Sequence, residues 1–173
     1  MEFKVTRKQP NSKDCIVCGM SNHSSLKTQT YELENGVVVG ITKGENHHQS
    51  YPHRMHGGVI TALLDEVIGR AINIEEPETF GVTASLEIKF KKPVPLDEQI
   101  KIVGKVTRNT SKLFEAEGFI ENENGDILAT AHALYVKQSV EKISGSAFTE
   151  EEWFVIPDEV ETMDIKNVDY FNK

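Results

Sequence analysis

The chain has 173 residues, of which 38% are hydrophobic and 27% are charged, and its formal net charge at pH 7 is −8. This composition predicts a globular domain, and the acidic balance argues against nucleic acid as a partner. The apolar runs fall short of the roughly 18 residues that span a membrane, and the first residues lack the apolar core of a signal peptide. We therefore expect a cytoplasmic protein without a membrane partner.

Residues 1–26 are polar and irregular, and we expect them to form an N-terminal arm that packs loosely on the body. The arm contains Cys15 and Cys18 in a Cys-x-x-Cys-Gly arrangement. Two cysteines are too few for a disulfide framework.

Residues 27–137 contain the signals of a folded domain. A hairpin is predicted from Thr28 to Lys43, because Asn35-Gly36 separates two β-rich runs and both turn residues tolerate positive φ. A polar loop follows, and a helix then starts at His56-Gly57-Gly58. One broad apolar face of this helix predicts that it is largely enclosed.

The second half of the domain predicts four strands. Residues 82–90 alternate between apolar and polar side chains, and similar runs cover residues 100–108, 114–120 and 127–137. Short turns separate the last three runs, which favours antiparallel pairing. The predicted order is β-β-α-β-β-β-β, an α+β architecture in which a mostly antiparallel sheet wraps one helix.

Residues 138–173 form an acidic C-terminal extension, with nine acidic residues and three lysines. A short helix is predicted within it. Thr149 and Glu152 fit a capping box, Phe148 and Trp153 fit a hydrophobic staple, and Pro157 would end the helix.

Two features of the central helix have chemical potential. Gly57 and Gly58 leave unpaired N–H groups at the helix start, which could stabilise an oxyanion, although a plain glycine-rich start is the simpler interpretation. Asp65 lies at the edge of the apolar face, where it is either a general base or nucleophile or an exposed carboxylate. Roughly 10 Å of helix separates Gly58 from Asp65, too far for one chain to bring both to one reacting atom.

Two other groups of residues are candidates for binding. Cys15 and Cys18 with His53 and His56 would make a Cys2His2 zinc site, but the gap between the pairs is much longer than in a zinc finger, so we expect no metal. A basic cluster near Pro93 would bind phosphates or would simply be a solvated strand end. Its residues are Lys89, Lys91, Lys92, Arg108 and Lys112.

The combined pattern resembles the hotdog-fold acyl-CoA thioesterases of the phenylacetate-pathway (PaaI-like) group. The resemblance rests on His56-Gly57-Gly58 with Asp65, on the strand and turn at residues 82–95, on Cys15-x-x-Cys18-Gly19 and on His48-Gln49-x-Tyr51-Pro52. It covers residues 15–137 and implies a hotdog fold, a long helix wrapped by a curved antiparallel sheet. It also implies homodimers, often paired into homotetramers, with active sites at the dimer interface.

The resemblance also implies roles in hydrolysis of a small or medium acyl-CoA or aryl-CoA. Gly57 or Gly58 of one subunit would polarise the thioester carbonyl, and Asp65 of the other would activate water or attack. His56 would shape the loop, and Thr83 would help to hold the water. Ser50 stands where some relatives have Asn or Gln. Among the basic residues, Lys91, Lys92, Arg108 and Lys112 would meet the CoA phosphates.

No cofactor is expected beyond the coenzyme A that the substrate carries. Two alternative functions remain open: a non-catalytic acyl-CoA-binding hotdog protein acting as a sensor or scaffold, and a hotdog enoyl-CoA hydratase. The chain lacks an Asp-His hydratase motif on a strand-to-helix loop, which disfavours the hydratase.

Overall fold

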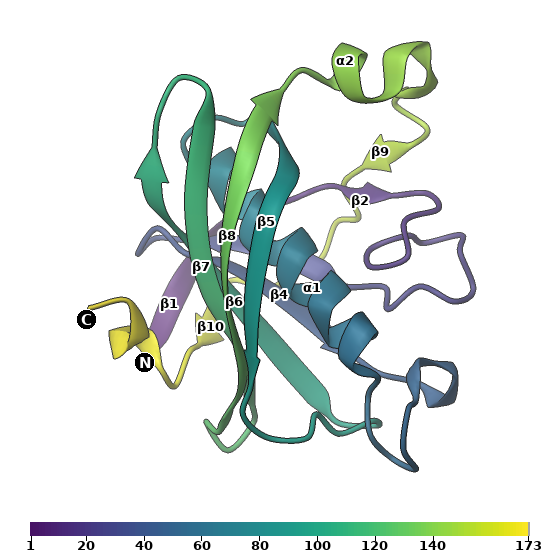
Figure 1. Ribbon diagram of the computed structural model, residues 1–173, viewed down its shortest axis with the longest axis vertical. Helices are drawn as coiled ribbons and strands as arrows, with labels where there is room; N and C mark the ends of the chain where they lie inside the picture. Colours follow the sequence, from purple (N-terminus) through teal and green to yellow (C-terminus); the bar gives the residue numbers. More distant parts are fainter. Residues whose placement is uncertain (173) are drawn as a thin grey trace.

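The computed structural model describes residues 1–172 and contains one large antiparallel sheet, with the strand order β10-β1-β3-β4-β6-β7-β8-β5. Figure 1 shows the long helix α1 lying along this sheet, with a small pair formed by β2 and β9 to one side. The strands are β1 (Glu2–Lys8), β2 (Asn11–Ser12), β3 (Gln29–Leu33), β4 (Val38–Lys43), β5 (Phe80–Phe90), β6 (Gln99–Asn109), β7 (Leu113–Asn122), β8 (Ile127–Gln138), β9 (Trp153–Phe154) and β10 (Thr162–Asp164). The helices are α1 (Gly57–Gly69) and α2 (Val140–Ser144), with 3-10 turns η1 (Asn46–His48), η2 (Arg70–Ile74), η3 (Gly145–Ala147) and η4 (Val168–Asn172).

Helix α1 packs directly on the middle of the sheet. Gly104 of β6 and Gly118 of β7 are paired opposite each other under Ile68 of the helix. A Cβ atom at Gly118 would lie 2.5 Å from Ile68 Cγ2, and one at Gly104 would lie 2.9 Å from Ile68 Cα. Glycine at both positions therefore lets the helix lie close to the strands. The apolar face of the helix is buried there, through Ile60, Leu63, Leu64, Val67 and Ile68.

The predicted order β-β-α-β-β-β-β is confirmed between β3 and β8. The hairpin of β3 and β4 turns at Gly36, which has φ +76°, as the Asn35-Gly36 signal predicts. The antiparallel sheet and its single central helix confirm the α+β prediction.

The expectation of a loosely packed N-terminal arm is wrong for its first strand. β1 pairs with β3 on one side and with β10 of the C-terminal segment on the other. Met163 and Ile165 from that segment are buried, and they cover an apolar cluster on the sheet together with Phe119. Both ends of the chain are therefore parts of the sheet and its packing.

The short helix predicted at Thr149 is also wrong. Residues 149–152 form a turn, in which the Glu152 N–H donates to the Thr149 carbonyl, and Trp153 and Phe154 then pair with β2. The short helix of this extension is α2, which lies earlier in the chain. A single helical turn is costly to nucleate, so the contacts of Trp153 and Phe148 with Phe80 decide the local structure.

None of the helices formed by residues 1–172 is long and apolar enough to cross a membrane.

A carboxylate after η2 ties the end of the helix to the sheet. Glu76 accepts hydrogen bonds from Lys137 (2.5 Å), Asn109 (3.0 Å) and Thr79 (2.8 Å), which lower its pKa from 4.5 to about 2. A carboxylate whose pKa is lowered by folding stabilises the folded state at pH values above its ordinary pKa. This stabilisation is lost as the pH falls toward the folded-state pKa.

We predict that Glu76→Gln lowers the melting temperature at pH 7 by about 2–4 °C, the shift expected for about 1 kcal/mol in a domain of this size. The difference from wild type should shrink as the pH falls from about 4.5 toward 2, because protonation removes the same interaction from wild type. Circular dichroism melts across this range measure it, with the exposed Glu78→Gln as the matched control. A difference that stays constant with pH would contradict the prediction.

Candidate active site

Asp65 lies on the flank of α1 that faces β5. Its Oδ1 accepts hydrogen bonds from Thr83 Oγ1 (2.8 Å) and from the Tyr135 hydroxyl (3.3 Å), which also donates to the Asp65 main-chain carbonyl (2.9 Å). Oδ2 accepts no hydrogen bond from residues 1–172. Two residues singled out from the sequence, Asp65 and Thr83, therefore meet, and one carboxylate oxygen is left open to a ligand or water.

Tyr135 is the residue of this group that the sequence analysis missed. It is 1% exposed and stacks on Phe114, with ring centroids 4.8 Å apart. Burial, followed by the negative charge of Asp65, raises the pKa of Tyr135 well above its ordinary value, so the hydroxyl remains a neutral donor. The alternation of β8 was the available signal, because Ala131, Ala133 and Tyr135 all face inward.

A cavity of about 150 Å³ adjoins Asp65. Thr83 and Tyr135 line it on the sheet side, and the aromatic rings of Phe80 and Trp153 also contribute. Trp153 comes from the C-terminal extension, so this extension forms part of the wall beside the carboxylate.

The start of α1 carries a second set of polar groups. His56 caps the helix, and its Nδ1 accepts the N–H of Gly58 at 2.8 Å. Within residues 1–172 the N–H of Gly57 has no acceptor. A Cβ atom at Gly57 would lie 3.7 Å from the Phe90 ring, so Gly57 sits beside the end of β5. Of the two glycines, Gly57 is the one with a free N–H donor.

A larger cavity of about 530 Å³ opens at this helix start. Ser50, Gly57, Lys91 and Lys92 line it together, which brings four of the predicted residues to one place. The exposed Arg54 adds a third cation that the sequence analysis did not single out. One of the lysines already has a partner, since Lys92 Nζ lies 2.6 Å from Asp126 Oδ1.

Arg108 and Lys112 do not join this cluster within one chain. Arg108 lies at the far end of β6, where it pairs with Glu115 at 3.0 Å, and Lys112 lies in the turn that follows. Eight residues of strand separate Ile100 from Arg108, roughly 26 Å at the usual rise per residue. The turn at Pro93 lies near the other end of that strand, so the predicted single basic cluster is wrong for one protomer.

The cysteine pair lies away from the histidines of the predicted Cys2His2 alternative. His53 is on an exposed loop and His56 caps α1, whereas Cys15 and Cys18 pack against Glu66 on the helix. Glu66 also forms an i, i+4 ion pair with Arg70, with 2.6 Å between Oε1 and Nη2.

Comparisons with known proteins agree with this fold. A model of the Thioesterase superfamily matches residues 53–129. A thioesterase superfamily protein of known structure is 28% identical, with a TM-score of 0.65, and the match covers 72% of this chain and 60% of that one. The PaaI protein of the E. coli phenylacetic acid degradation operon shares the fold at 16% identity, with a TM-score of 0.60 over 66% of this chain and 81% of that one. The chain has the hotdog fold.

Mouse acyl-coenzyme A thioesterase THEM4 is 30% identical over 107 residues, which are 61% of this chain and 45% of THEM4. The chain therefore spans less than half the length of that relative's sequence. The resemblance to hotdog acyl-CoA thioesterases that the sequence predicts is confirmed at the level of the fold.

Proposed function

We propose that the protein is an acyl-CoA thioesterase that hydrolyses a small or medium acyl-CoA or aryl-CoA. The observation that carries the proposal is the arrangement of Asp65, whose Oδ1 is held by Thr83 and Tyr135 while Oδ2 accepts no hydrogen bond from residues 1–172, beside a cavity of about 150 Å³. The match to the Thioesterase superfamily model and the similarity to mouse acyl-coenzyme A thioesterase THEM4 support the same reaction.

In the proposed reaction Asp65 acts as the general base. Its carboxylate takes a proton from a water molecule, and the water oxygen attacks the thioester carbon. The carbonyl oxygen becomes an oxyanion, which the free N–H of Gly57 stabilises. The intermediate then expels the CoA thiolate, which takes up the proton held by Asp65, so that the products are the free acid and CoA and the carboxylate is restored. A thioester carbonyl is already electrophilic, so one base and one donor suffice, and no cofactor beyond the substrate's coenzyme A takes part.

We propose that the complete site contains groups from two protomers. Thr83, beside Asp65, and Phe90, beside Gly57, lie toward opposite ends of β5. β5 is an edge strand with exposed apolar side chains at Val82 and Phe90, and such an edge is a template for pairing. Antiparallel pairing of two β5 strands would bring the Gly57 end of one chain toward the Asp65 end of the other.

The same assembly gives the remaining residues their proposed roles. The cavity lined by Ser50, Lys91 and Lys92, with Arg54 at its wall, would hold the phosphates of CoA. Arg108 and Lys112 would reach a CoA molecule only as residues of another protomer. The cavity beside Asp65 would take the acyl group, and its volume of about 150 Å³ favours a small one.

The decisive experiment is hydrolysis of an acyl-CoA panel by wild type and by Asp65→Asn, which keeps the size of the side chain. We expect kcat to fall by about 10²–10⁴-fold, because the general base is lost. The rate is measured from the free thiol of the CoA that hydrolysis releases. The exposed Glu98→Gln is a matched control that should retain full activity. Tight CoA binding without turnover by wild type would favour the sensor alternative, and hydration of an enoyl-CoA would favour the hydratase.

Gly57→Pro tests the oxyanion donor without disturbing the helix. Proline lacks the N–H but is well tolerated at the first helical position, and His56 already has the extended conformation that precedes proline (φ −65°, ψ 138°). We expect a loss of about 10²–10³-fold in kcat with an unchanged melting temperature. Gly57→Ala retains the N–H and is the control; if both variants lose the same activity, the donor lies elsewhere.

Mixing the two inactive variants tests the shared site. In a mixed dimer of Asp65→Asn and Gly57→Pro, one of the two sites contains an intact Gly57 and an intact Asp65. Random exchange of protomers should therefore restore about a quarter of wild-type activity. Activity after mild dissociation and reassociation measures this, and each variant reassociated alone is the control. No recovery, despite mixed dimers seen by native mass spectrometry, would place both groups in one protomer.

A further inference from the structure

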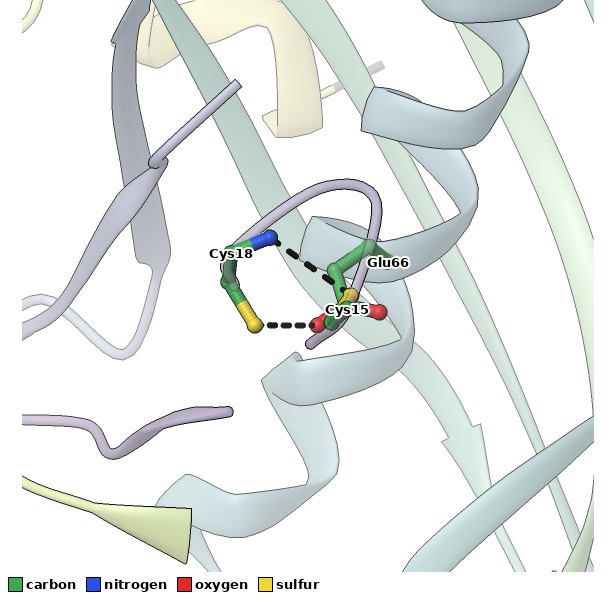
Figure 2. Close-up of side chains that lie close together, drawn as sticks. All are labelled: Cys15, Cys18 and Glu66. Atoms are coloured by element: carbon green, nitrogen blue, oxygen red, sulfur yellow. Dashed lines mark hydrogen bonds between the residues drawn. The ribbon is translucent and has the colours of Figure 1, made fainter. Parts of the chain in front are cut away.

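Three side chains that can bind a metal ion, and that the proposed reaction does not use, lie close together. Two come from the N-terminal segment and one from α1. Figure 2 shows Cys15 and Cys18 of the N-terminal segment facing Glu66 of the helix. The two sulfur atoms and one carboxylate oxygen all lie within 4.8 Å of one another. The Cys18 thiol donates a hydrogen bond to Glu66 Oε1 at 3.4 Å, so its proton would have to leave for a metal to take its place. Among residues 1–172 this is the one group of three or more histidine, cysteine or acidic side chains with such spacing.

The backbone around the cysteines is shaped to surround sulfur with donors. The N–H groups of Val17 (3.3 Å) and Cys18 (3.5 Å) point at Cys15 Sγ, and the N–H of Ser12 (3.4 Å) points at Cys18 Sγ. A neutral thiol is a weak acceptor, so this many donors suits a thiolate. The turn closes through a hydrogen bond from Gly19 N–H to the Cys15 carbonyl, and a Cβ atom at Gly19 would lie 2.2 Å from that oxygen.

A buried cation completes the environment. Arg70, which is 6% exposed, donates from Nη2 to Cys18 Sγ at 3.1 Å and to Glu66 Oε1 at 2.6 Å. Two thiolates and one carboxylate outnumber this single guanidinium by two charges. A divalent cation would bring the total to zero, and Arg70 would then act as an outer donor that orients two of the ligands.

We propose that Cys15, Cys18 and Glu66 bind one zinc ion. At a tetrahedral zinc centre, Zn–S bonds of about 2.3 Å and Zn–O bonds of about 2.0–2.2 Å put sulfur and oxygen roughly 3.5 Å apart, close to the spacing found here. Two thiolate ligands select zinc over magnesium or calcium, which prefer oxygen. A water molecule or the second carboxylate oxygen of Glu66 completes the coordination.

The role assigned to this zinc is structural. It would fasten the N-terminal segment to α1 one residue away from Asp65, and it takes no part in the proposed hydrolysis. The zinc proposal and the proposed hydrolysis can therefore be tested independently. Zinc content is measured without substrate, and Asp65→Asn should retain the metal.

The test is the zinc content of the full chain, purified under reductant and without a polyhistidine tag. We expect about one zinc per chain by mass spectrometry of the element. After chelation, cobalt(II) should restore binding, with a sulfur-to-cobalt charge-transfer band in the near ultraviolet. Cys15→Ser and Cys18→Ser should each weaken metal binding by more than about 100-fold. The melting temperature of wild type should fall on chelation and recover when zinc is returned.

The matched control is His53→Ala, which removes a histidine of the alternative Cys2His2 site from an exposed loop. It should keep one zinc per chain, and loss of the metal in this variant would overturn the proposed ligand set. Because a serine variant could fail to fold, the cobalt spectrum of wild type is the second, independent measurement. A wild-type chain that carries no zinc and gives no cobalt band overturns the proposal. A Cys15–Cys18 disulfide, seen as the loss of two hydrogens in the intact mass, overturns it as well.

Discussion

The contact between α1 and the glycine pair of the sheet is the constraint on which the rest of the structure depends. Gly104 and Gly118 allow Ile68 to lie directly on the strands, and this contact sets both the height and the rotation of the helix. With Ile68 facing the sheet, Asp65 is turned toward β5, where Thr83 and Tyr135 meet it. A side chain at either glycine would push the helix away and would separate the carboxylate from its two donors.

This constraint also explains which features were predictable from the sequence. The apolar face of α1 and the glycines at its start are local patterns, and they identify the helix and Asp65. Thr83 was singled out only through the family resemblance. Tyr135 is distant in sequence, and only the rotation of the helix relative to β8 brings its hydroxyl to Asp65. The error on Arg108 and Lys112 has the same origin, because residues that look clustered in the sequence lie at opposite ends of an antiparallel strand.

The two ends of the chain were the hardest parts to predict, and both meet at Arg70. This buried guanidinium donates to the Pro10 carbonyl and to Cys18 in the N-terminal segment, and it stacks on Trp153 of the C-terminal extension at 4.6 Å. The planar guanidinium contacts these partners and Glu66 at the same time, which a lysine ammonium cannot do. A capping box at Thr149 and Glu152 would stabilise a helix less than these contacts stabilise the observed structure. Trp153 therefore pairs in β9, and the segment before it forms a turn.

The arrangement along β5 links the proposed chemistry to assembly. One chain has a free N–H at Gly57 near one end of this strand and a poised carboxylate near the other, and the helix between them is rigid. Closing that distance within the chain would require breaking α1, whose buried face holds the core together. In the proposed dimer, pairing of two edge strands would close it without any change inside the protomer, and it would also cover the exposed Val82 and Phe90. A site divided as we propose would be active only in the associated state, so the concentration of protomers would determine activity as well as stability.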